Sequence, residues 1–151
     1  MKQNTKPKQA AVNATTHDNQ CPNCGTPSQP STATLRHDIN GEPQHIDGIA
    51  HLACPRCAEK LISAAAVRQL QQAAIVAYRQ RHGLLAAAEI RQLREAMALT
   101  QAELAQLLQL GDNTLSRWEA GRAAQTGAMD VLLRLVRDVP AARVFLQKRA
   151  A

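Results

Sequence analysis

Four cysteines in two closely spaced pairs constrain the fold of this chain more than any other feature. They form two Cys-x-x-Cys sequences, Cys21 with Cys24 and Cys54 with Cys57, and residues 25–53 separate the pairs. Two intervening residues allow a tight turn that directs both thiolates to one ion, and two such turns complete the tetrahedron of a closed zinc site. Gly25, directly after the first pair, permits a positive φ there. We therefore expect one structural Zn²⁺ per chain, bound by all four cysteines.

Other uses of these cysteines agree less well with the sequence. Iron in a rubredoxin-like site is an alternative, but rubredoxins pack aromatic residues around the metal and residues 21–60 contain none. A catalytic zinc ion needs an open coordination position, which four thiolates do not leave. A thioredoxin-type dithiol needs only one pair. His37, His45 and His51 lie between the pairs, and one of them could replace a cysteine, but we expect them to be exposed hairpin residues.

The residues between the cysteine pairs predict a β-hairpin. Thr32–Ile39 and Gln44–Leu52 each favour an extended conformation, and Asn40-Gly41 between them is a turn signal. Such a hairpin has little apolar core, so we expect metal at its base to supply most of its folding free energy.

The middle of the chain predicts a helix over residues 63–81, which we interpret as a linking helix. Ser63 is a plausible N-cap and Gly83 is placed to end the helix. Apolar residues recur at helical spacing: Val67, Leu70, Ala74, Ala77 and Tyr78. Its arginines, Arg68, Arg79 and Arg81, form a basic face that could contact DNA phosphates or an acidic partner, although such a face is usually only the solvated side.

From Ala87 onward the pattern predicts two helices that meet at a short turn. Ile90, Leu93 and Met97 mark the apolar face of the first. The second begins at a capping box in which the Thr100 hydroxyl accepts from the Glu103 amide and the Glu103 carboxylate reaches back.

A third helix is predicted from about Asn113 to Ala120, closed by Gly121. Leu115 and Trp118 face the core, whereas Asn113, Thr114 and Arg117 face outward. An Asn and an Arg one turn apart suit readout of the major groove, because Asn pairs with adenine and Arg with guanine. We interpret this helix as the recognition helix of a helix-turn-helix.

This run resembles the Xre/Cro-type repressor helix-turn-helix over about residues 88–140. The resemblance lies in Ile90–Arg94, Leu99–Ala105 and Thr114–Gly121. It implies that Gln101 contacts the DNA backbone or a base and that Arg94 and Glu119 form an internal bridge. The sequence departs from the family at the turn, where Gln109 replaces the expected glycine and Gly111 the usual Ser/Thr cap.

Both halves together resemble the MqsA antitoxins, also called YgiT-type zinc finger proteins. The resemblance covers nearly everything after residue 20. It implies that the zinc unit binds and neutralises a ribonuclease toxin, that the C-terminal domain dimerises and represses the operon, and that Asn113 and Arg117 read bases.

The predicted fold class is mainly α. A small four-Cys zinc-bound β-hairpin module precedes a linking helix and a five-helix Xre/Cro-like helix-turn-helix domain. The expected boundaries are a disordered tail at residues 1–19, the zinc module at 20–62, the linking helix at 63–86 and the DNA-binding and dimerisation domain at 87–151.

The end of the chain predicts two further helices, Met129–Val139 and Ala141–Arg149. Their apolar residues exceed what one small core needs, so we expect part of this surface to form a homodimer that binds a palindromic operator in double-stranded DNA. Arg122, just after the recognition helix, is a candidate phosphate contact.

Composition excludes several other classes of protein. The formal charge of +6 suits a polyanionic partner but is modest. No stretch approaches the length of a membrane span and no signal peptide is recognisable, so we expect a cytoplasmic protein. No catalytic constellation is evident, and we expect no enzyme.

The sequence thus favours a repressor that is the antitoxin of a type II pair; the alternative is a stand-alone Xre-family regulator whose zinc module is structural or metal-sensing.

Overall fold

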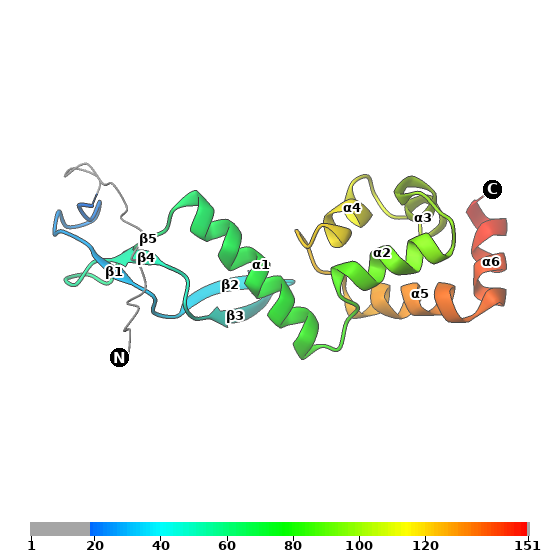
Figure 1. Cartoon of the computed structure of the whole chain (residues 1–151), viewed down its shortest axis with the longest axis horizontal. Helices are drawn as coiled ribbons and strands as arrows, with labels where there is room; N and C mark the ends of the chain where they lie inside the picture. Colours follow the sequence, from blue (N-terminus) through cyan, green and yellow to red (C-terminus); the bar gives the residue numbers. More distant parts are fainter. Residues whose placement is uncertain (1–18, 151) are drawn as a thin grey trace, which may run out of the picture. The chain divides into compact units, whose positions relative to one another are not determined.

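The computed structural model describes residues 19–150 (Figure 1). The tail predicted for residues 1–19 therefore lies, apart from its last residue, outside the described residues. The contacts divide the chain into two units. One extends to Ser31 and includes Ala50–Ser63; the other contains Thr32–Ile49 and the residues from Ala64 onward. The predicted predominance of helix is confirmed.

The first unit is a small antiparallel sheet combined with the cysteine turns. Its strands are β1 (Gln29–Ser31), β4 (His51–Ala53) and β5 (Lys60–Leu61), in the order β1-β4-β5. Pro30 is compatible with β1 because β1 is an edge strand.

The second unit opens with the predicted hairpin, formed by β2 (Leu35–Ile39) and β3 (Glu42–Ile46). Asn40 and Gly41 both have positive φ, at 50° and 83°, as a two-residue type I′ hairpin turn requires. The extended run expected over Gln44–Leu52 is interrupted, because the chain turns at Gly48, with φ of 81°, between β3 and β4.

The hairpin packs against α1 (Ala64–Arg81), which lies across both strands (Figure 1). Ile39 belongs to an apolar cluster with Ala74, Ile75 and Tyr78 of α1. Our sequence analysis grouped the hairpin with the cysteines in residues 20–62, but the structure divides these residues between the two units. The physical reason is burial: Leu35 and Ile39 face inward on β2, and α1 offers the apolar surface against which Ile39 packs.

Helix α1 begins and ends where the sequence predicts. Its apolar face differs in detail, since Val67 is 43% exposed whereas Ile75 is buried. Gly83 follows the helix with φ of 60°, and the Leu84 amide donates to Arg79 O, which closes the helix end.

Arg79 does not belong to the solvated basic face expected of this helix; it is only 5% exposed. Its Nε donates to Gln125 Oε1 and its Nη2 to the backbone oxygens of Trp118 and Ala123, each at 3.1 Å. Burial lowers the pKa of this guanidinium, while the nearby Asp130 charge opposes the shift. Three acceptors far along the chain compensate for the lost hydration, so a charged residue can occupy a buried position here.

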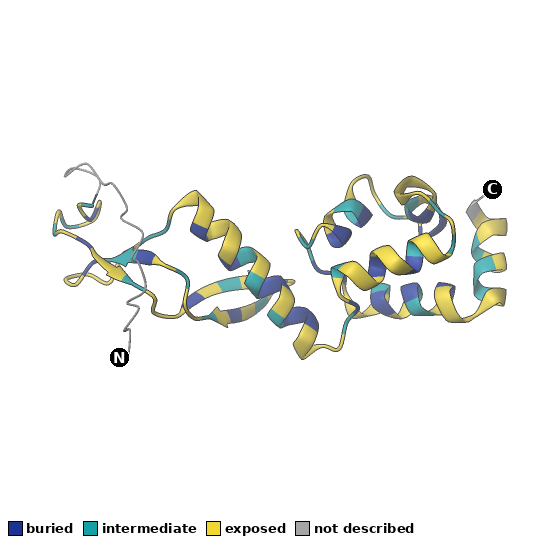
Figure 2. Ribbon diagram, in the orientation of Figure 1, coloured by how far each residue is buried: buried dark blue, intermediate teal, exposed yellow. Residues whose placement is uncertain are grey.

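The remaining helices form one core. They are α2 (Ala87–Ala96), α3 (Gln101–Leu107), α4 (Thr114–Glu119), α5 (Gly127–Asp138) and α6 (Pro140–Ala150). One face of each of α2–α5 is buried (Figure 2). The buried core side chains are Leu85, Ile90, Leu93, Leu104, Leu107, Leu108, Leu115, Trp118, Leu133 and Val136. Among the described residues, no helix is long and apolar enough to cross a membrane.

Local interactions at the helix ends explain where α3 starts and stops. The predicted capping box is present: the Glu103 amide donates to Thr100 Oγ1 at 3.2 Å, and the Thr100 amide donates to Glu103 Oε2 at 2.7 Å. At the other end, Gln109 adopts φ of 54° and the Leu110 amide donates to Ala105 O at 2.8 Å. This is a Schellman motif with glutamine at the position that usually holds glycine.

Candidate metal centre and nucleic-acid interface

The first unit brings the four cysteine sulfurs together. Their Sγ atoms all lie within 4.8 Å of one another. Cys21 Sγ and Cys57 Sγ are 3.5 Å apart, and Cys24 Sγ and Cys54 Sγ are 3.4 Å apart. A tetrahedral Zn²⁺ with bonds of about 2.3 Å separates its sulfur ligands by about 3.8 Å. The donor set and its spacing therefore fit one metal ion bound by four thiolates.

Both cysteine pairs adopt the same backbone turn. The Gly25 amide donates to Cys21 O at 2.8 Å, and the Ala58 amide donates to Cys54 O at 3.0 Å. The residues that close these turns both have positive φ, 71° for Gly25 and 59° for Ala58. The sequence signals the first conformation through its glycine but gives no such signal for the second.

The cluster also favours the thiolate form of one cysteine. The Thr26 hydroxyl, 3.4 Å from Cys24 Sγ, lowers the pKa of Cys24 to about 6, and the Thr26 backbone and Cys54 add to the shift. Thiolates are the form that binds metal.

None of the three histidines belongs to the cluster, which comprises the four cysteines among the described residues. Two lie on the hairpin, where His45 is exposed and His37 is half-buried. His51 lies on β4 and is buried, so the expectation of exposed hairpin residues is met fully by His45, in part by His37, and is wrong for His51. Its strand, β4, belongs to the three-stranded sheet of the first unit, and the sequence did not predict this sheet.

In the second unit, α3 and α4 present the residues expected to contact DNA. Asn113 and Arg117 are exposed, and Thr114 is half-buried. Leu115, Trp118 and Glu119 are buried and hold α4 to the core. Asn113 precedes α4 with φ of 62° and its side chain makes no capping hydrogen bond.

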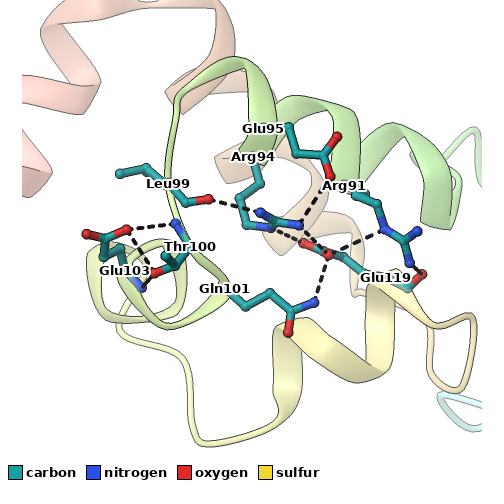
Figure 3. A network of polar contacts seen from close by, with 8 residues as sticks. All are labelled: Arg91, Arg94, Glu95, Leu99, Thr100, Gln101, Glu103 and Glu119. Carbon is teal, nitrogen blue, oxygen red and sulfur yellow. Dashed lines mark hydrogen bonds and ion pairs between the residues drawn. The ribbon is translucent and has the colours of Figure 1, made fainter.

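Glu119 is the centre of a polar network that connects α2, α3 and α4 (Figure 3). Arg94 Nε donates to Glu119 Oε1 at 2.7 Å and Arg94 Nη2 to Oε2 at 3.0 Å, so the bridge implied by the family resemblance is present. Gln101 Nε2 donates to the same Oε2 at 2.8 Å. Gln101, an expected DNA contact, therefore also fixes α3 against the end of α4.

The network keeps the Glu119 carboxylate ionised inside the protein. Burial works to raise the pKa of Glu119, but the hydrogen bonds from Arg94 and Gln101 and the charges of Arg94 and Arg91 together lower it. Arg91 Nε lies 3.8 Å from Glu119 Oε2.

Arg122 follows α4 and is exposed. Its backbone amide donates to Arg117 O at 2.8 Å, and its backbone oxygen accepts from Gln71 Nε2 of α1 at 3.3 Å. The sequence does not predict this contact between α1 and the segment after α4, because a glutamine on a helix surface gives no indication of a partner that lies far along the chain.

The chain thus combines a four-cysteine cluster whose spacing suits a metal ion with a helical domain whose apolar core is accompanied by a buried ion pair. The family model described as "Antitoxin component of bacterial toxin-antitoxin system, MqsA" matches residues 14–142. The chain therefore belongs to the MqsA antitoxin family. Membership implies that its partner is a toxin, and antitoxins are typically not enzymes. No curated protein gives a match to this chain.

Proposed function

We propose that this antitoxin is a dimeric, sequence-specific DNA-binding repressor that neutralises a ribonuclease toxin and represses its own operon. The observation that carries the DNA-binding half is the presentation of α4. Asn113, directly before α4, and Arg117 within it are exposed four positions apart, while Leu115, Trp118 and Glu119 of α4 are buried. A short helix anchored on one side and polar on the other fits the major groove as a recognition helix.

The chemistry of the two exposed side chains supports base readout. The Asn113 amide can pair bidentately with adenine, and the Arg117 guanidinium can do the same with guanine. Arg117 forms no ion pair within residues 19–150, so its donors remain available.

Three further residues are proposed to contact the DNA backbone. Gln101 lies at the start of α3 and keeps its amide oxygen and a second amide hydrogen beyond its bond to Glu119. Thr114 begins α4, and Arg122 is exposed directly after it. Phosphate contacts from both ends of a recognition helix set its register in the groove.

We propose that α5 and α6 form the dimer interface. Val131, Leu135 and Val139 are exposed at a spacing that places them on one face, and Val131 is 57% exposed. On α6, Val144 is 49% and Phe145 63% exposed. Exposed apolar side chains of this size along two consecutive helices favour burial against a second copy, and a two-fold dimer implies a palindromic operator.

We propose that Zn²⁺ occupies the four-cysteine site as a structural ion. Four thiolates suit Zn²⁺ and leave no position for a substrate. The first unit buries few apolar side chains, so metal binding supplies most of its folding free energy. The family resemblance assigns this unit to the toxin, so the metal would maintain a surface that binds protein.

The DNA-binding half is tested by combining Asn113→Ala with Arg117→Ala. Specific operators are first selected from random duplexes with the unmodified protein. The double variant should bind the selected operator at least about 30-fold more weakly, because each lost contact is worth about 1–3 kcal/mol of discrimination. Its thermal unfolding temperature should fall only slightly: both side chains are exposed, and the one expected cost is that alanine adopts the positive φ of position 113 less easily than asparagine.

The matched control removes one amide and one guanidinium elsewhere. Arg36→Ala combined with Gln92→Ala changes exposed residues of β2 and α2 and should leave operator affinity within a few-fold of the unmodified protein. Equal losses in both double variants, or unfolding of the first, would contradict the assignment of α4 as the recognition helix.

A further inference from the structure

A carboxylate lies within the surface assigned above to DNA. A groove of about 590 Å³ separates α3 from α4, and its lining includes Gln101, Gln106, Asp112, Asn113 and Ser116. Asp112 is exposed, and its side chain makes neither an ion pair nor a hydrogen bond with any of residues 19–150. No contact within the described residues therefore engages this carboxylate.

The backbone fixes Asp112 beside Asn113. The turn before it is closed by Gln109 in the left-handed conformation, and the Thr114 amide donates to Gly111 O at 3.2 Å across it. Asn113 has φ of 62°, and its backbone oxygen accepts from Ser116 Oγ at 3.0 Å. Asp112 thus occupies a defined turn that leads directly into the proposed recognition helix.

An acidic side chain at this position has an unfavourable effect on general DNA affinity. Phosphates repel it, and no partner cation within residues 19–150 neutralises it. In the major groove, however, a carboxylate can accept a hydrogen bond from the N4 amino group of cytosine, while it repels the acceptor oxygens of guanine and thymine. Such a group weakens binding in general and favours one base.

We propose that Asp112 is a specificity-determining residue that selects cytosine at one position of each operator half-site. The proposal rests on the proposed DNA-binding function and extends it to a third base-reading residue beside Asn113 and Arg117. Cytosine is the base selected because an ionised carboxylate only accepts hydrogen bonds, and the other base with an amino donor in the major groove, adenine, carries the acceptor N7 beside that donor, which repels a carboxylate.

Sequence selection from random duplexes with the full-length protein and its Asp112→Asn variant tests this proposal. The unmodified protein should enrich cytosine at one position per half-site. The variant should lose that preference by about tenfold while it keeps the preferences at all other positions. Asp38→Asn, an exposed carboxylate of the hairpin, is the matched control and should leave every preference unchanged.

The outcomes separate the possible explanations. Identical preferences with uniformly tighter binding by the Asp112→Asn variant would show that the carboxylate only repels DNA and would overturn the proposal. A lower stability of the variant with unchanged preferences would overturn it too, because it would assign Asp112 to the favourable charge at the start of α4. If the unmodified protein enriched no sequence at all, the proposed DNA-binding function would fail first and the assignment of Asp112 with it.

Discussion

Besides Asn40 and Asn113, three further residues among those that the structure describes adopt left-handed conformations that glycine adopts more easily. Ala58, Ala98 and Gln109 have φ of 59°, 54° and 54°. Ala98 and Gln109 end α2 and α3, where the amides of Leu99 and Leu110 donate to the carbonyl oxygens five residues earlier. The family resemblance expected glycine at position 109, and the structure retains the turn without it. The surrounding helices therefore impose this conformation on a residue that disfavours it.

We predict that Gln109→Gly stabilises the helical domain by about 1 kcal/mol, because glycine adopts positive φ without strain. Urea unfolding followed by circular dichroism measures the change. The matched control, Gln92→Gly in the interior of α2, should destabilise the domain by about 0.5–1 kcal/mol. Opposite signs for one chemical change would show that backbone conformation causes both effects; the same sign would refute the explanation.

At the scale of the helices and strands, regular periodicity made the helices predictable. α1 begins and ends where the apolar spacing and Gly83 indicate, and the Asn40-Gly41 turn forms the expected hairpin. Contacts between distant segments carry no local signal. Arg79 looks like a solvated arginine until Trp118, Ala123 and Gln125 surround it. In the same way, a hairpin sequence does not reveal that α1 covers it.

The network around Glu119 joins three helices and should make their stability depend on pH. The pKa of Glu119 in the folded protein is below its ordinary value of 4.5. The ionised carboxylate therefore contributes its full stabilisation when the pH is above 4.5. This contribution is lost as the pH falls through the lower pKa of the folded state. Asp130 acts in the same direction: burial would raise its pKa, but hydrogen bonds from Leu85, Arg134 and Gln125 lower it.

We predict that Glu119→Gln lowers the free energy of unfolding by about 3 kcal/mol at neutral pH, since it leaves Arg94 without its buried partner. Measured from pH 7 to pH 3, the variant should also lose less stability than the unmodified protein. Glu95→Gln serves as the control because Glu95 is mainly exposed and lies 3.7 Å from the same arginine. A pH dependence identical in all three proteins would refute the stabilising role of this carboxylate.

The whole molecule combines two units that are stabilised in different ways. The first has a four-cysteine cluster and a short sheet, whereas the second has an apolar core and buried polar networks. Membership in the MqsA family gives the chain a toxin partner, and the proposed division assigns toxin binding to the first unit and DNA binding to the second. Damage to one unit should then leave the activity of the other intact.

The division of toxin binding and DNA binding between the two units is tested most directly by a growth measurement. Cells express the open reading frame adjacent to this gene, alone and together with variants of this protein. We predict growth arrest by the neighbour alone. The unmodified protein and the Asn113→Ala, Arg117→Ala double variant should both relieve the arrest and co-purify with the neighbour. Cys54→Ser, which removes one metal ligand, should fail to do either while it still binds the operator. Unaffected growth with the neighbour alone, or full rescue by Cys54→Ser, would contradict the account.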